Sequence, residues 1–210
     1  MAEAAEQGTI RVWDPLIRIG HWVLVAGFAT AYLTEGEPEW LHTWAGYAIA
    51  ITVALRGLWG FVGPRRARFS DFVTGPGRVV AYLRDLLAGR AERHLGHSPA
   101  GGAMTLALLV TLAVTAVSGM GTLAAEEGRG PLAGLVVTAH PAGAASSYER
   151  EGYDEHEAHD EAGEAWEDIH EVAANLSLVL ILLHVAGVGL ASYAHRENLA
   201  SAMVTGRKKA

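Results

Sequence analysis

Four long apolar stretches constrain this chain more than any other feature of its sequence. They cover approximately residues 16–33, 41–62, 103–124 and 172–194. A helix that crosses a bilayer needs about 20 mostly apolar residues, so each stretch can span a membrane. Half of the residues are hydrophobic and the mean hydropathy is +0.19, which is unusually apolar for a soluble domain. The sequence therefore predicts an all-α integral membrane protein, with residues 1–210 forming a single four-helix bundle.

The loops between the stretches carry opposite charges and orient the bundle. Seven arginines lie between the second and third stretches, and the C-terminal tail adds Arg196, Arg207, Lys208 and Lys209. The positive-inside rule places both segments in the cytoplasm, so we expect both termini there, in the inner membrane of a bacterium. Residues 126–168 hold twelve acidic residues and two arginines. They are expected to form an acidic periplasmic loop.

Two further segments give expectations about the cytoplasmic side. In the basic loop, residues 77–89 (GRVVAYLRDLLAG) show apolar positions at helical spacing, which predicts a short amphipathic helix on the membrane surface. The first residues lack a basic segment followed by an apolar core, so we do not expect a signal peptide. A nucleic-acid partner is not expected.

Four histidines lie within or at the ends of the apolar stretches: His21, His42, His170 and His184. Ionisable side chains are rare inside a bilayer and usually mark function. His170 and His184 are fourteen residues apart, which on a helix is a rise of about 21 Å and almost a whole number of turns. The two rings therefore share one helix face and lie near opposite membrane surfaces.

The loop charges give each histidine a depth. His21 and His184 lie toward the cytoplasm, whereas His42 and His170 lie toward the periplasm, so each pair can ligate one iron ion between facing helices. The chain has no cysteine, which excludes iron–sulfur clusters, zinc–thiolate sites and covalently attached haem. The pattern thus predicts two non-covalent b-type haems, an inner one held by His21 and His184 and an outer one held by His42 and His170.

Two arginines are candidates for binding the haem propionates. Arg18 lies one helical turn before His21, and Arg56 lies near the cytoplasmic end of the second stretch. A guanidinium is a suitable charge-assisted donor to a carboxylate. The alternative is that both side chains only extend toward the membrane surface. Glycines on the ligand-bearing helices fit either a macrocycle or ordinary helix packing.

Several segments resemble one protein family. They are VWDPLIRIGHW, LHTWAGYAIAITVALRGLWGFVGP, YLRDLLAGRAERHLGHSPAGGAM and IHEVAANLSLVLILLHVAGV. Across residues 10–206 the chain resembles the bacterial cytochrome b561 family, which is related to the b-type cytochrome subunits of nickel–iron hydrogenases. The resemblance implies that the four histidines are haem ligands and that electrons are exchanged with membrane quinone, as in a respiratory chain. The long acidic loop departs from that pattern.

The expected function is electron transfer of the oxidoreductase type across a lipid membrane, between the quinone pool and a periplasmic carrier such as a basic c-type cytochrome. The acidic loop favours such a carrier because opposite charges steer encounter. One alternative is a haem-bearing anchor subunit of a larger oxidoreductase. Another is a metal transporter using His156 and His159, although the four stretches contain no acidic residue at mid-membrane. His94 and His97 are expected in an interfacial loop, with a place near the inner haem or a quinone pocket as the alternative.

Overall fold

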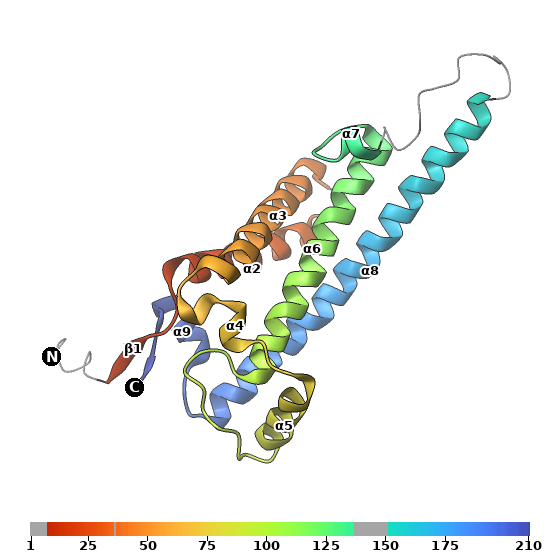
Figure 1. The fold of residues 1–210 in the computed structure, drawn as a ribbon. Helices are drawn as coiled ribbons and strands as arrows, with labels where there is room; N and C mark the ends of the chain where they lie inside the picture. Colours follow the sequence, from red (N-terminus) through yellow and green to blue (C-terminus); the bar gives the residue numbers. More distant parts are fainter. Residues whose placement is uncertain (1–7, 36, 137–150) are drawn as a thin grey trace. The chain divides into compact units, whose positions relative to one another are not determined.

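The computed structural model describes residues 8–35, 37–136 and 151–210, with side chains in the last range from residue 163 onward. Figure 1 shows a chain built almost entirely of helices. In order, the elements are β1 (Thr9–Arg11), α2 (Pro15–Leu33), α3 (Glu39–Val62), the 3-10 helix η1 (Arg65–Ala67), α4 (Phe69–Phe72), α5 (Pro76–Leu87), α6 (Pro99–Glu127), α7 (Ala133–Val136), α8 (Glu151–Ala194), α9 (Leu199–Thr205) and β2 (Arg207–Lys209).

The predicted all-α membrane fold is confirmed. Among the described residues, four helical segments are long and apolar enough to cross a bilayer: Pro15–Leu33, Glu39–Val62, Pro99–Glu127 and Gly163–Ala194. Helix α5 overlaps most of the segment predicted to be amphipathic, beginning one residue before it and ending two residues before its end, and it buries Tyr82 and Leu86. The helical structure of this chain is thus set by apolar periodicity, since in hydrocarbon a helix satisfies its own backbone.

The expected acidic loop is shorter than residues 126–168. Helix α6 continues to Glu127, and α8 already begins at Glu151. Residues 151–168 are rich in alanine and glutamate and contain no proline, so their helix propensity is high. Charge made this segment look like a loop, but its propensity extends the helix beyond the apolar stretch.

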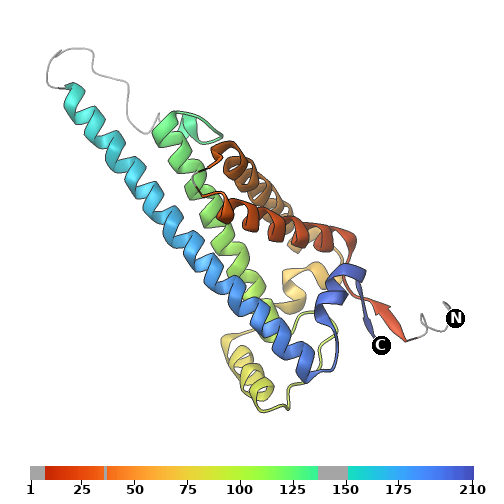
Figure 2. The ribbon, with the colours of Figure 1, turned by 180° about the vertical axis from the view of Figure 1, so that it is seen from behind.

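By its internal contacts the chain divides into two compact units. One comprises Met1–Val110 with Leu178–Ala210, and the other comprises Thr111–Ser177. Helices α6 and α8 contribute residues to both units. In the first unit α2 packs along α3 (Figure 1, Figure 2). A Cβ atom added at Gly27 would lie 3.1 Å from Cγ1 of Ile49, so this glycine is used for close packing of the two helices.

Asp14 fixes the start of α2. Its Oδ1 accepts hydrogen bonds from the backbone N–H groups of Leu16 and Ile17, at 2.9 and 3.1 Å, which satisfies two donors of the first turn. Its Oδ2 lies 3.5 Å from Nε1 of Trp59 near the end of α3. The carboxylate thus caps α2 and connects it to α3.

The two ends of the chain form a small structure, which we call the terminal clasp. Strand β1 pairs antiparallel with β2, and Ile10 lies opposite Lys208 (Figure 2). Helix α9 ends at Thr205 and is followed by Gly206, whose φ of 77° favours glycine. The Gly206 carbonyl accepts a 2.8 Å hydrogen bond from the N–H of Val12. A small core lies beneath the clasp and contains Val12, Trp13, Ile17, Ala67 and Ala202.

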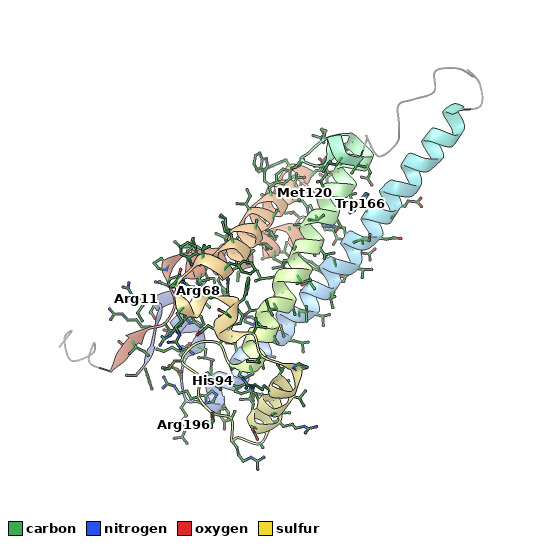
Figure 3. All side chains as sticks on the ribbon, in the orientation of Figure 1. Arg11, Arg68, His94, Met120, Trp166 and Arg196 are labelled. Atoms are coloured by element: carbon green, nitrogen blue, oxygen red, sulfur yellow. The ribbon has the colours of Figure 1, made fainter. Side chains whose placement is uncertain are left out.

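A buried ion pair joins this clasp to the segment before α6. Glu197 is only 7% exposed, and its two oxygens each lie 3.2 Å from a nitrogen of Arg93. The backbone N–H of Lys209 also donates to Glu197. Figure 3 labels Arg196, which precedes Glu197 in the sequence, and His94, which follows Arg93. A carboxylate so placed needs these donors, because an unpaired buried charge is costly.

We predict that Glu197→Gln weakens the clasp. The substitution removes the charge from the hydrogen bonds to Arg93, and hydrogen bonds to charged groups contribute about 1.5–3 kcal/mol each. The apparent free energy of unfolding in detergent should fall by an amount in this range. Asp85→Asn, which removes an exposed ion pair with Arg90, is the matched control and should change it by less than about 0.5 kcal/mol. Equal effects of the two variants would contradict the assignment.

We also predict an acid-sensitive clasp. Burial opposes ionisation of Glu197, but hydrogen bonds from Arg93 and Lys209 and the charges of Arg93 and Lys208 lower its pKa below the ordinary 4.5. A lowered folded-state pKa adds stability that is complete above pH 4.5 and is lost as the pH falls through the lowered pKa. Thermal unfolding of the wild type should therefore show a larger loss below pH 4.5 than that of Glu197→Gln. Parallel pH curves would refute the role of Glu197.

Candidate functional site

His21 and His184 face each other within the first unit. They lie on α2 and α8, and their ring centres are 6.4 Å apart with the ring planes at 55°. A metal–imidazole bond is about 2.0–2.1 Å long, so two imidazoles on opposite sides of one metal ion have centres about 6 Å apart. The separation therefore fits a shared iron ion. The predicted inner ligands are brought together by helices from opposite ends of the chain.

One nitrogen of the His21 ring makes no hydrogen bond with the described residues. This nitrogen, Nδ1, is buried. The neighbouring Trp22 contacts the ring edge-to-face, with centres 5.2 Å apart. A buried polar nitrogen without a partner is costly, and ligation or hydrogen bonding to a bound group would remove that cost.

His42, near the start of α3, is oriented by a backbone carbonyl. Its Nδ1 lies 2.9 Å from the carbonyl oxygen of Ala31 on α2. Since a carbonyl can only accept, Nδ1 carries the proton and Nε2 carries the lone pair. Histidines that bind metals commonly donate the other ring N–H to a carbonyl in this way.

His170 is oriented in the same manner in the second unit. Its Nδ1 lies 2.8 Å from the carbonyl oxygen of Thr115 on α6, and the hydroxyl of Ser118 is 3.4 Å from the same nitrogen. The carbonyl again assigns the lone pair to Nε2. Both predicted outer ligands thus have the tautomer and the orienting hydrogen bond of metal-binding histidines.

Two glycines on α6 make room for aromatic rings from α8. A Cβ atom added at Gly119 would lie 2.8 Å from Cε1 of His170, and one added at Gly121 would lie 2.4 Å from the ring of Trp166. Figure 3 labels Trp166 on α8 and Met120 on α6 within this unit. Any larger residue at 119 would push the His170 ring away from its carbonyl. Sequence reasoning missed these glycines because α6 carries no ligand of its own.

The two candidate arginines differ in their surroundings. Arg18 donates through Nη2 to the carbonyl oxygen of Val204 on α9, although its Nε is buried without a partner. Arg56 lies over the aromatic rings of Phe69 and Phe72, 5.2 and 6.0 Å from their centres. Both of its terminal nitrogens are buried and have no hydrogen-bond partner among the described residues. Arg56 therefore has more donor capacity to offer a ligand.

His97 lies in a buried position that the sequence did not indicate. Its ring contacts Phe72 and Trp13, with ring centres 4.2 and 4.7 Å apart respectively. Ser98 follows it and caps α6, with its Oγ 3.1 Å from the N–H of Gly101. Burial, and then the positive charges of Arg56 and Lys208, lower the pKa of His97 to about 3. The ring is therefore neutral at physiological pH.

The other histidines are not gathered into a metal site. His94 lies near Tyr82, and Tyr82 Oη is 3.4 Å from Nε2 of His195. Within the described part of the chain, no three histidine or acidic side chains are placed to share a metal ion. The side chains of His156 and His159, considered for metal binding, lie outside the described residues.

Comparison with known proteins gives one match. Residues 12–206 match the family model described as prokaryotic cytochrome b561. No curated protein and no solved structure matches the chain. The matched range contains all four candidate ligands and both candidate arginines.

We predict that Gly119→Ala displaces the His170 ring. The added methyl group would lie within 3 Å of the ring, so the hydrogen bond to Thr115 is lost. Bound haem, measured by the pyridine hemochromogen assay, should fall relative to the wild type. Gly77→Ala is the control, because a Cβ atom there meets nothing within 4 Å. Unchanged haem content in Gly119→Ala would show that the close approach does not position a ligand.

Proposed function

Because the chain belongs to the prokaryotic cytochrome b561 family, whose members are b-type haem electron-transfer proteins of the membrane, we propose that it carries electrons between two haems. One haem is held by His21 and His184 and the other by His42 and His170. The observation that carries the proposal is the facing of His21 and His184 with 6.4 Å between ring centres. These rings come from residues 163 positions apart in the sequence, so the pairing is a property of the fold.

The proposal of a second haem is supported by the loop charges and by the tautomer and hydrogen bond of each outer histidine. His42 and His170 each donate Nδ1–H to a backbone carbonyl of a neighbouring helix. This hydrogen bond sets the tautomer and raises the basicity of the ligating nitrogen. The depth expected for each histidine from the positive-inside rule pairs these two at the periplasmic level.

The haem iron supplies reversible one-electron oxidation and reduction, and the protein controls where this takes place. His21 and His184 would hold one iron, and His42 and His170 would hold the other. Arg56 would offer buried donors to a propionate. A fixed ligand geometry on rigid helices means that little has to rearrange when the charge of the iron changes.

We further propose that the chain lies in the inner membrane with both termini in the cytoplasm. The charges at the chain ends and in the loop after α3 support this orientation. One end of the electron path would exchange electrons with membrane quinone, and the other with a basic carrier at the acidic periplasmic segment before the apolar part of α8. The acidic residues of this segment support the choice of a positively charged partner.

The haem count tests the dihaem proposal. The purified wild type should contain two b-type haems per chain. His184→Ala should leave only the outer haem, because only the inner iron loses a ligand. His170→Ala should leave only the inner haem, and the spectra of the two variants should differ. His94→Ala, outside the four spans, serves as the control and should keep both. One haem in the wild type, or loss of both haems in either variant, would overturn the scheme of two independent sites.

Salt dependence tests the docking proposal. Raising ionic strength from about 0.01 M to 0.15 M shortens the screening length from about 30 Å to about 8 Å. The rate of electron exchange with a basic c-type cytochrome should therefore fall steeply, whereas exchange with an uncharged quinol analogue should remain constant. A rate with the cytochrome that is insensitive to salt would rule out electrostatic docking.

A further inference from the structure

Besides Nε of Arg18 and Nδ1 of His21, three buried nitrogen atoms in the first unit have no hydrogen-bond partner among the described residues. They are Nη1 and Nη2 of Arg56 and Nδ1 of His97. Both side chains contact the same ring: the Arg56 guanidinium lies 6.0 Å from the centre of Phe72, and the His97 ring lies 4.2 Å from it. The three nitrogens thus belong to one site, which we call the donor pocket.

The pocket is held in place by the surrounding fold. Phe72 packs on the start of α6, where a Cβ atom added at Gly102 would lie 2.7 Å from the Phe72 carbonyl oxygen. Trp13, between β1 and α2, contacts the His97 ring edge-to-face. The pocket therefore combines segments from four parts of the sequence and does not depend on a flexible surface loop.

The chemistry of the pocket favours an anion with oxygen atoms. A guanidinium offers only donors, and its planar fork matches a carboxylate. His97 is neutral, so its Nδ1 can also donate in the tautomer that protonates this nitrogen. The nearby carboxylate of Asp14 is already engaged with Leu16, Ile17 and Trp59. An anion from outside the chain would satisfy all three nitrogens.

We propose that Arg56 and His97 bind a propionate carboxylate of the inner haem. This rests on the proposed function, because it requires that His21 and His184 hold that haem. The charge of His184 is the smallest of the four effects that lower the pKa of His97, so the two rings lie within electrostatic range of each other. The three nitrogens are sealed from solvent, whereas a lipid phosphate would be held at an exposed surface. The propionate is therefore the occupant that fits.

The contact would give the pocket a positioning role. A bis-histidine haem can rotate about the axis through its two ligands, and a fixed propionate prevents this rotation. Arg56 and His97 are positioning residues for the macrocycle, whereas the two histidines hold the iron. Replacing Arg56 or His97 should therefore weaken binding of the propionate and leave the two histidine ligands of the iron unchanged.

The test compares haem with its dimethyl ester, in which both propionates lack charge. Each is titrated into haem-free full-length protein carrying His170→Ala, so that the inner site alone is filled. This protein should prefer haem over the ester by about 10- to 100-fold, the range expected for a hydrogen bond to a charged group. Arg56→Gln and His97→Gln should each reduce that preference, while the bis-histidine absorption spectrum stays unchanged.

The matched controls replace an arginine and a histidine that lie outside the donor pocket. Arg65→Gln removes an arginine that is 92% exposed, and His94→Gln removes the other histidine of the segment, whose Nδ1 lies near the Glu92 carbonyl oxygen. Both should keep the full preference for haem. Arg56→Lys keeps the charge but lacks the planar fork, so it should retain part of the preference for haem over the ester. Because it is the more conservative change, it also shows whether a loss in Arg56→Gln comes from impaired folding.

The outcomes separate this inference from the proposed function. If no haem binds when His170 is replaced, the inner site itself fails and both proposals fall. If haem binds but the starting protein does not distinguish it from the ester, or if Arg56→Gln and His97→Gln keep the full preference, only the donor pocket assignment is overturned. Loss of copurifying anionic lipid in Arg56→Gln without a change in that preference would assign the pocket to a lipid phosphate and would likewise overturn it.

Discussion

An imidazole placed inside hydrocarbon needs a hydrogen-bond partner or a metal ion from within the protein, because the lipid offers neither. Backbone groups meet the same requirement by forming helices, which explains the four long apolar segments of this chain. The four histidines add side-chain nitrogens that the helices cannot satisfy by themselves. How each ring meets the requirement differs between the candidate outer ligands, His42 and His170, and the candidate inner ligands, His21 and His184.

In the candidate outer ligands, one nitrogen of each ring is already used. His42 and His170 donate to the carbonyls of Ala31 and Thr115, so tautomer and direction are set by the fold. At the inner site, His21 has a buried nitrogen without a partner and faces His184 directly. The outer ligands are thus oriented by backbone carbonyls, whereas His21 of the inner pair keeps a buried nitrogen that a bound group would satisfy.

The sequence could predict features that depend on local pattern. Apolar length predicted the four spans, and helical spacing predicted α5, because both signals lie within one segment. It could not place His97, whose burial depends on Trp13 and Phe72, residues far away along the chain. Arg18 and Arg56 were equivalent candidates, but only the fold brings the Val204 carbonyl to Arg18 and leaves both terminal nitrogens of Arg56 unsatisfied. The sequence did not predict that α8 begins at Glu151, because the acidic composition of this segment suggested a loop.

The terminal clasp gives the inner pair a common support. Strand β1 leads into α2, which carries His21, and β2 follows α9 after α8, which carries His184. Pairing of β1 with β2, the bond from Val12 to Gly206 and the contact of Arg18 with α9 therefore tie the ends of both ligand-bearing helices together. Because Trp13 in the clasp also contacts His97, the same small structure supports the ligands and the donor pocket. Loosening the clasp should therefore affect both features of the inner site together.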